Sequence, residues 1–204
     1  MLPKRIGVVG FDGVMALDLV GPSEAFTAAV VDERNGSRQP CYEVVILGLS
    51  SRAFAAESGI VFAPHHTLES APALDTLIIP GGSGLRDTRI NDRVCAWLKR
   101  HARHIRRIAS VCTGIYGLAP TGLLNGRRVT THWRFAEDVA ARFPALKLDR
   151  NALFVRDGAL YTSAGITAGI DLALALIEED HGAQVALSVA RELVVYFKRP
   201  GGQE

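Results

Sequence analysis

The chain has 204 residues, of which 48% are hydrophobic and 22% charged, and its formal net charge is +2. This length and balance predict one globular domain with a sizeable core, and the small net charge excludes the basic footprint of a typical DNA-binding domain. The three cysteines, Cys41, Cys95 and Cys112, contain no CxxC pair, which favours reduced thiols in the cytoplasm over a disulfide framework. We also expect no signal peptide and no membrane-spanning helix, because no apolar run is long enough.

The first predicted strand is the apolar run at residues 6–10, which is typical of a strand buried in a parallel sheet. Gly21-Pro22 then suits a helix start, with proline at the first helical position. Asp18 would then lie in a loop before the helix, at the rim where open α/β sheets bind ligands. A turn or capping aspartate is the alternative, and the local pattern alone favours it.

Two further apolar runs, residues 42–48 and 74–79, predict buried strands, with a small antiparallel excursion over residues 54–64 between them. The second run ends in a glycine cluster that contains Gly81 and Gly82. Such glycines let backbone N–H groups approach a ligand or an oxyanion closely, whereas the lysine of a phosphate loop is absent. We therefore interpret this cluster as a candidate ligand-binding loop.

Histidines and basic residues in this half of the chain carry weaker signals. The pair His65-His66 has no third ligand nearby, so we expect it at the surface and predict neither a metal site nor a cofactor. Residues 91–103 predict a helix with an apolar face. The basic run at 99–107 is interpreted as a solvated helix end, because cations there complement the helix dipole, and not as a nucleic-acid contact.

The stretch from Ala109 to Trp133 carries the strongest chemical signal. A short apolar run leads directly to Cys112, after which Thr113-Gly114 open a helical pattern. A strand that breaks into a helix at a nucleophile-type residue is the layout of a nucleophile elbow, where the helix N-terminus lowers the pKa of the thiol. A buried structural cysteine is the alternative, and spacing alone leaves both open. We expect Cys112 to be alkylated or oxidised faster than the other two cysteines.

The remaining segments continue the alternation of strands and helices. Residues 129–133 predict a short strand or loop before a helix over 135–143, and residues 153–161 predict a hairpin with a turn at Asp157-Gly158. Thr167 is placed to cap a long helix, and a last helix from about Ala183 keeps helical spacing as far as Phe197. The alternation predicts a single α/β domain with a mostly parallel sheet covered on both faces.

Five motifs taken in order, DLVGP, IIPGG, SVCTG, TTHW and SAGITAGIDLAL, resemble the PfpI-type branch of the class I glutamine amidotransferase-like superfamily. The resemblance covers residues 5–198. It implies a flavodoxin-like three-layer α/β/α sandwich with a mostly parallel sheet and a cysteine at the nucleophile elbow. Two branches fit: the isocyanide hydratases, which carry similar DLxGP and SVCTG motifs, and the sensor domains of AraC-type transcriptional regulators.

The segment 178–203 resembles the end of the AraC-type sensor domain, in which an RPGGQ stretch leads into two helix-turn-helix motifs. The resemblance implies a ligand-sensing domain over residues 1–198 and the start of a linker over 199–204, with the DNA-binding half missing; a frayed tail is the alternative for the last residues. It also implies a cytoplasmic homodimer without membrane contact. Its effector would be a small polar molecule such as an amino-acid-derived amine, an amide or a quaternary ammonium compound, and DNA would be bound only through the missing half.

Compared residue by residue, Asp18 matches the acid of the hydratases, Cys112 their nucleophile, and Thr113 the neighbour that frames their site. No histidine can be placed beside the thiol as a base, since His132 and His181 match no catalytic position. We therefore expect a ligand to bind without turnover, with Gly82 and Thr113 supplying backbone donors. The expected ligand-binding residues are Asp18, Gly81, Gly82, Cys112, Thr113 and Thr167.

An enzyme is the alternative function. In that case Cys112 and Asp18 would be the catalytic residues of a stand-alone isocyanide hydratase-like enzyme or of a small amide hydrolase. A retained elbow serves binding and catalysis equally well, so the motifs alone do not separate the two.

Overall fold

The computed structural model describes residues 2–32, 36–197, 199 and 201–203. Residues 198, 200 and 204, on which part of the expected boundary between domain and linker falls, lie outside the described residues.

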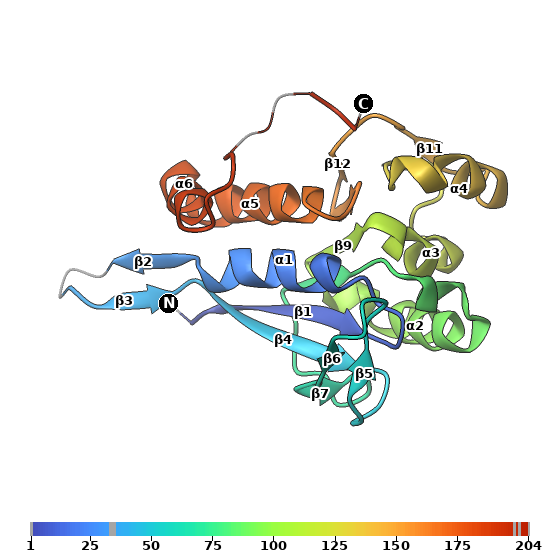
Figure 1. The fold of residues 1–204 in the computed structure, drawn as a ribbon, viewed down its shortest axis with the longest axis horizontal. Coiled ribbons are helices and arrows are strands. Elements are labelled where there is room, and N and C mark those ends of the chain that lie inside the picture. The colour runs from blue at the N-terminus through green and yellow to red at the C-terminus, as the bar shows by residue number, and fades with distance from the viewer. Residues whose placement is uncertain (1, 33–35, 198, 200, 204) are drawn as a thin grey trace.

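A seven-stranded sheet forms the centre of the described part of the chain (Figure 1). Neighbouring strands pair in parallel except β12 and β13, which form the predicted hairpin at one edge. Its two turn residues are Gly158 and Ala159, one position later than expected. In spatial order the strands are β12 (Phe154–Asp157), β13 (Leu160–Ser163), β9 (Arg107–Val111), β8 (Thr76–Ile79), β1 (Lys4–Gly10), β4 (Tyr42–Gly48) and β7 (His66–Thr67).

Helices cover both faces of this sheet. Ile79 of β8 pairs with Ser110 of β9, so Val111 points to the opposite face, because successive strand residues alternate. A Cβ at Gly117 in α3 would contact Ile79, and one at Gly169 in α5 would contact Val111, which places α3 and α5 on opposite faces. The helices are α1 (Ala16–Thr27), α2 (Thr88–His101), α3 (Ile115–Leu118), α4 (Ala136–Arg142), α5 (Ala168–His181) and α6 (Ala183–Glu192).

Helix α1 packs beside α5, and α2 beside α3, so the sheet is the middle of three layers (Figure 1). The inner strands are the ones that sequence predicts as continuous apolar runs: all residues of β8 and β9 are buried. The predicted flavodoxin-like α/β/α sandwich is confirmed. No helix within the described ranges is long and apolar enough to cross a membrane.

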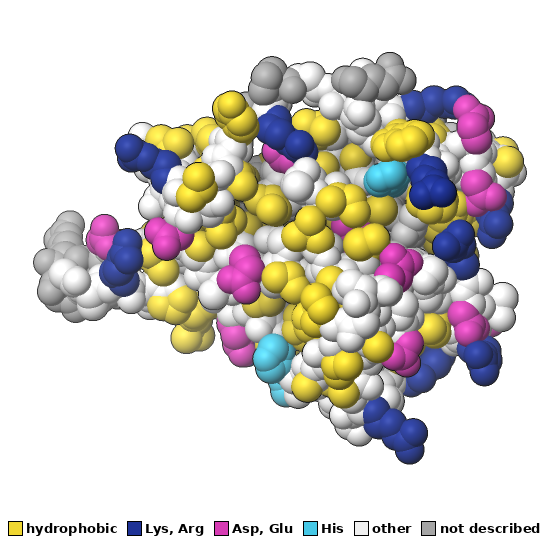
Figure 2. Space-filling view, in the orientation of Figure 1, with side chains coloured by type: hydrophobic (Ala, Val, Ile, Leu, Met, Phe, Trp, Pro, Cys, Tyr) yellow, Lys and Arg dark blue, Asp and Glu magenta, His cyan; other side chains and the backbone are white. Residues whose placement is uncertain are grey.

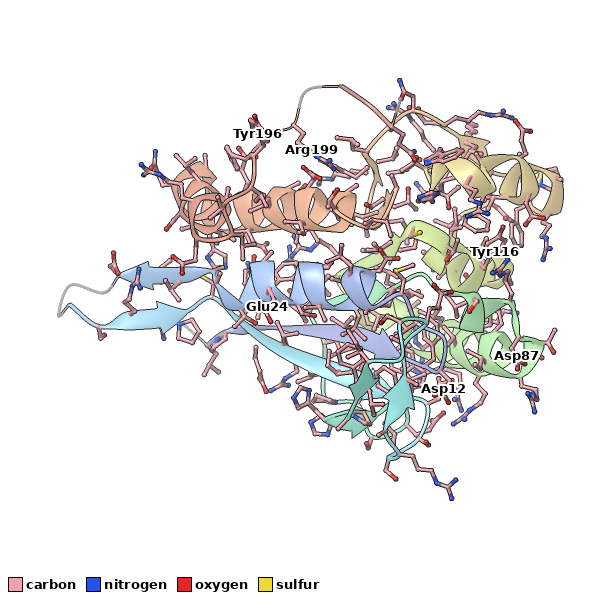
Figure 3. The ribbon with its side chains drawn as sticks, viewed as in Figure 1. Asp12, Glu24, Asp87, Tyr116, Tyr196 and Arg199 are labelled. Carbon is pink, nitrogen blue, oxygen red and sulfur yellow. The ribbon has the colours of Figure 1, made fainter. Side chains whose placement is uncertain are left out.

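Short elements decorate this core. The predicted antiparallel excursion is the pair β5 (Phe54–Ala55) and β6 (Val61–Phe62), held to the end of β1 because the Asp12 carboxylate accepts from the backbone N–H of Ala55 at 2.9 Å (Figure 3). The other short elements are β2 (Val30–Asp32), β3 (Arg38–Pro40), β10 (Arg128–Val129), β11 (Lys147–Leu148) and 3-10 turns at Ser83–Arg86, Ala102–His104, Cys112–Gly114, Ala119–Thr121 and Trp133–Phe135.

Two predicted helix boundaries are wrong. Helix α1 begins at Ala16 rather than at Gly21-Pro22, so Asp18 lies in its first turn and not in a loop. Met15 starts the helix instead: its N–H donates to the Gly81 carbonyl at 2.8 Å, while its carbonyl accepts from the N–H groups of Asp18 and Leu19. The proline removes only one hydrogen bond near this end, which the tertiary contacts tolerate.

Helix α6 also ends earlier than predicted, at Glu192 rather than near Phe197. Val194 adopts a left-handed φ of 55°, and the N–H of Val195 turns back to the Ala190 carbonyl at 2.9 Å. The Val194 side chain is 90% exposed, so it does not belong to the buried face that its helical spacing suggested. Thr167 precedes α5 in helical backbone geometry, and its side chain makes no capping hydrogen bond.

The basic run at residues 99–107 is only in part a solvated helix end. Arg100 pairs with Glu69 at the surface, but Arg107 begins β9, is 3% exposed and lies 2.5 Å from the Asp180 carboxylate at the end of α5. Arg106 joins the same carboxylate at 2.9 Å. Arg106 and Arg107 therefore form ion pairs within the domain, at the end of the sheet where the parallel strands begin.

Candidate functional site

Cys112 lies at a sharp turn directly after β9. Its φ of 57° is in the left-handed region, which costs energy for a residue with a Cβ and is typical of a nucleophile elbow. Gly165 packs against it: a Cβ on this glycine, whose own φ is +90°, would lie 2.0 Å from the Cβ of Cys112. The predicted elbow geometry is therefore present, and glycine is required at position 165 to make room for it.

Asp18 is brought against the elbow from the first turn of α1 and is fully buried, with 0% of its surface exposed. One carboxylate oxygen accepts from the N–H of Ile166 at 2.6 Å, the other from the N–H of Gly81 at 3.1 Å, and the Cys112 thiol donates to the same group. Burial raises the pKa of Asp18 to about 6, although these hydrogen bonds oppose the shift. Asp18 is thus a buried carboxylate held by backbone donors.

The pKa of the Cys112 thiol is raised, whereas the elbow layout predicts that it is lowered. Burial raises its pKa, the Asp18 carboxylate raises it further, and hydrogen bonds from Thr113 oppose these effects without overcoming them. The expected lowering by a helix N-terminus fails because only a 3-10 turn and the four residues of α3 follow. A protonated thiol that donates to a carboxylate is the result. This removes the physical basis for expecting especially rapid labelling of Cys112, and its labelling relative to Cys41 and Cys95 stays a prediction.

The backbone donors that we expected for an oxyanion already have partners within the chain. The N–H of Gly82 donates to the Thr113 hydroxyl at 2.8 Å, and the N–H of Thr113 donates to the Cys112 sulfur. The N–H of Gly81 is bonded to Asp18. These three groups build the floor of the site and are not presented to a ligand as an oxyanion hole.

A cavity of about 280 Å³ opens above the elbow. Its charged groups are Glu57, Arg86 and Arg134, and its aromatic wall is Phe135, over which the Arg86 guanidinium lies at 5.6 Å. Glu57 is fixed by the N–H of Ser83 at 2.6 Å. The full lining is Met15, Glu57, Gly82, Ser83, Arg86, Cys112, Thr113, His132, Arg134, Phe135 and Ile166.

His132 also lines this cavity, although it matches no catalytic position of the resemblance. Its Nδ1 accepts from the N–H of Arg134 at 3.3 Å, and its ring lies 5.6 Å from that of Trp133. Burial, with a smaller contribution from Arg134, lowers the pKa of His132, so the ring is neutral at pH 7. Among the described residues, no hydrogen bond joins His132 to the thiol, and its role in the cavity is to form part of the wall.

The structure therefore brings together five of the six expected site residues and separates the sixth. Gly82, Cys112 and Thr113 line the cavity, and Asp18 and Gly81 lie directly behind them. Thr167 does not line this cavity. It lines a different one of about 230 Å³, with Ile170, Asp171 and the C-terminal residues Val194, Val195, Tyr196 and Arg199. Its neighbour Ile166 takes the place in the site, because the tight turn at Gly165 directs the chain away after one residue.

Four residues that line the cavity are not predicted from the sequence: Glu57, Arg86, Arg134 and Phe135. They come from the β5–β6 excursion and from two 3-10 turns, and none belongs to a motif of the resemblance. The charged and aromatic pair Arg134-Phe135, directly after the TTHW motif, was the one available signal.

His65 and His66 follow one another at the edge of the sheet, as part of β7 and the residue before it. The Nδ1 of His65 accepts from the backbone N–H of Ile46 at 2.8 Å, which uses this ring to fix the edge of the sheet. No group of three or more histidine, cysteine, aspartate or glutamate side chains suited to a metal ion occurs among the described residues.

Comparison with known proteins agrees with the fold. The profile of the DJ-1/PfpI family matches residues 4–179. Isonitrile hydratase from Pseudomonas putida is 33% identical over 189 residues, covering 93% of this chain and 77% of the hydratase. The HTH-type transcriptional regulator GbdR from Pseudomonas aeruginosa is 30% identical over 194 residues, covering 95% of this chain but 51% of the regulator, so the chain spans about half the length of that relative.

Solved structures show the same likeness. A ThiJ/PfpI family protein from Pseudomonas syringae superposes with a TM-score of 0.80 at 27% identity, over 98% of this chain and 78% of that one. An AraC family transcriptional regulator from Pseudomonas putida also reaches 0.80, over 94% of this chain and 100% of that one, and at 18% identity it supports the fold alone. With the profile match over residues 4–179, these likenesses establish that the chain belongs to the DJ-1/PfpI family.

Proposed function

We propose that this chain is the ligand-sensing domain of an AraC-type transcriptional regulator and binds a small polar metabolite in the cavity above Cys112. The observation that carries the proposal is the state of the elbow. Its thiol pKa is raised by burial and by Asp18, and the backbone donors of its floor have internal acceptors. A site that keeps its nucleophile protonated and lacks a free oxyanion hole is better suited to binding than to acyl chemistry.

The lining of the cavity supports a polar ligand. Glu57 offers a carboxylate to a cationic or amide group, and Arg134 offers a guanidinium to an anionic or carbonyl group. The cavity is close to the lower end of the range of about 300–1,000 Å³ that is common for small-molecule sites. Amines, amides and quaternary ammonium compounds derived from amino acids are therefore the first compounds to test.

The curated regulator similar to this chain is about twice its length, which supports a DNA-binding segment outside residues 1–198. On the face drawn in Figure 2, dark-blue and magenta side chains are intermixed instead of forming one basic patch. We propose that the domain dimerises, works in the cytoplasm and contacts DNA only through such a further segment, with residues 199–204 at the start of the connection.

A thermal-shift and calorimetry screen with these compounds tests the proposal. A ligand at a hundred times its Kd adds about 2.7 kcal/mol to the free energy of unfolding, or roughly 5–10 °C in Tm for a domain of this size. We expect at least one compound to stabilise the protein and to be recovered unchanged. Cys112→Ala is expected to weaken this binding, whereas Cys95→Ala, which alters a cysteine of α2 outside the cavity, is the matched control.

An activity assay added to this screen tests the alternative function, a cysteine-dependent enzyme. The 33% identity to isonitrile hydratase favours an assay with isocyanides and small amides. Steady turnover that is lost in Cys112→Ala and retained in Cys95→Ala would replace the sensor with a cysteine-dependent enzyme. The absence of both turnover and binding across the panel would contradict the proposed small-molecule site.

A further inference from the structure

The last described residues do not extend away from the domain but fold back onto it, beside the segment between β11 and β12 (Figure 1). The side chain of Gln203 is the centre of this contact. Its Oε1 accepts from the backbone N–H of Trp133 at 2.8 Å, while its Nε2 donates to the carbonyls of Thr131 and Arg150, both at 3.0 Å, and of Ala152 at 3.1 Å. Donor and acceptor of one carboxamide are therefore both satisfied by surrounding backbone.

The main chain of the same residue is held as well. The N–H of Gln203 donates to the Asn151 carbonyl at 2.9 Å and to its side-chain oxygen at 2.8 Å. Gly202 allows this approach, because a Cβ at that position would lie 2.1 Å from the Asn151 side-chain oxygen. The pair Gly202-Gln203, which the resemblance assigns to the start of a linker, thus has a shape and a hydrogen-bonding pattern that match the domain surface. We name this contact, with residues 130–133 and 150–152, the Gln203 clasp.

The clasp lies one residue away from the elbow. Thr131, which is almost fully buried, accepts from Gln203 through its carbonyl and donates through its hydroxyl to the Cys112 carbonyl at 2.9 Å. The next residue, His132, lines the cavity, and the one after it, Trp133, bonds Gln203 again. A single extended segment therefore contacts the elbow, the cavity and the C-terminal residues.

We propose that residues 130–133 and 150–152 form a docking site for the chain's own C-terminal segment, and that filling the cavity above Cys112 weakens this docking. The proposal rests on the proposed sensor function. A group that displaces His132 shifts the Thr131 carbonyl and the Trp133 N–H, which are the acceptor and donor that hold the carboxamide. Coupling of this kind is reciprocal and changes affinities by roughly 5- to 150-fold.

Amide hydrogen exchange tests the docking. Gln203→Ala removes the carboxamide, Gln203→Glu keeps its shape but places an oxygen against three carbonyls, and Gly202→Ala pushes the segment away from Asn151. We expect each to raise exchange at residues 130–133 and 150–153 at least threefold. Gln184→Ala, the same type of substitution at an exposed position of α6, is the control and is expected to leave those rates unchanged. Equal protection in all variants would overturn the docking site.

Alkylation of Cys112 by iodoacetamide tests the coupling without any unidentified ligand. The carboxamidomethyl group fills part of the cavity, and we expect it to raise exchange at residues 201–203 at least threefold in the otherwise unaltered chain. Reciprocally, Cys112 is expected to react at least threefold faster in Gln203→Ala than in Gln184→Ala. Labelling of Cys95 reports global opening and is expected to be equal in both variants.

The two experiments separate the two proposals. Altered exchange in the variants with no effect of alkylation would keep the docking site and overturn the coupling. Both effects without a stabilising compound in the ligand screen would keep the clasp and contradict the proposed sensor.

Discussion

Replacing the buried carboxylate of the site, Asp18→Asn, is expected to change how stability depends on pH. In the folded chain burial raises the pKa of Asp18 to about 6, from an ordinary value of 3.8. The folded state therefore holds this proton more tightly than the unfolded state. The resulting stabilisation is fully present below pH 4 and is lost as the pH rises through about 6. A shift of about 2 pKa units corresponds to about 3 kcal/mol.

Asparagine carries no charge at any of these pH values, so the variant lacks this contribution, and its own cost does not vary with pH. Urea unfolding followed by circular dichroism from pH 4 to 7.5 gives the free energy of unfolding of both proteins. We expect the value for the natural chain minus that for Asp18→Asn to fall by about 2.5 kcal/mol across this range, because most of the total lies between the two pKa values. Asp92→Asn, at an exposed position of α2, is the matched control. A difference that is flat or rises with pH would refute the account of this carboxylate.

Two further substitutions probe the elbow and the opposite edge of the sheet. Gly165→Ala places a Cβ 2.0 Å from that of Cys112 at a φ of +90°, and it is expected to cost about 2–4 kcal/mol of unfolding free energy by urea titration; a cost below about 1 kcal/mol would show that the elbow yields readily. Asp180→Asn removes the nearest carboxylate of the buried Arg107 but leaves Asp75 at 3.6 Å and Glu179 at 3.7 Å. It is expected to cost about 1.5–3 kcal/mol at neutral pH, measured in the same way, whereas a neutral effect would mean that this pair is dispensable. Burial by itself raises the pKa of Asp180, but the Arg107 charge and its hydrogen bonds lower it to about 2, so the difference between the two proteins is expected to persist down to about pH 4.

The layers of this fold could be predicted from local pattern because the inner strands are nearly continuous apolar runs. A strand such as β9 is buried on both faces, so it does not depend on a correct alternation of apolar and polar residues. The segments before and after it in the chain are helical, which marks its ends. The ends of helices were harder to predict. Gly21-Pro22 has the composition of a helix start, yet a hydrogen bond from Met15 to a loop sixty-six residues later starts α1 one turn before. No local pattern contains that bond.

The site was predictable to the extent that motifs and strand ends determine it. Asp18, Gly81 and Cys112 follow or approach the carboxyl ends of neighbouring parallel strands, and those ends meet at one edge of a sheet. The position of Thr167 depended on a tight turn two residues earlier, and the direction of the thiol pKa depended on burial. The tight turn and the burial are properties of the packed molecule and not of the local sequence. The spacing of residues therefore predicted which residues lie near the elbow better than it predicted the pKa of the thiol.

The pairing of Asp18 with Cys112 sets a condition on any chemistry that the elbow performs. The Asp18 carboxylate raises the pKa of the thiol, whereas the hydrogen bond that the thiol donates favours the ionised carboxylate. Because the pKa of Asp18 is about 6, the carboxylate carries the negative charge at neutral pH and the thiol keeps its proton. A nucleophilic step at the sulfur would therefore require transfer of the thiol proton to Asp18, the carboxylate to which it already donates. A binding step requires no such transfer and retains the hydrogen bond that fixes the elbow. The imidazole of His132, which lines the cavity, is neutral and accepts from the Arg134 backbone N–H. The Asp18 carboxylate is therefore the one described group that contacts the thiol and can accept its proton. Whether that proton transfer occurs decides between the sensor and the enzyme.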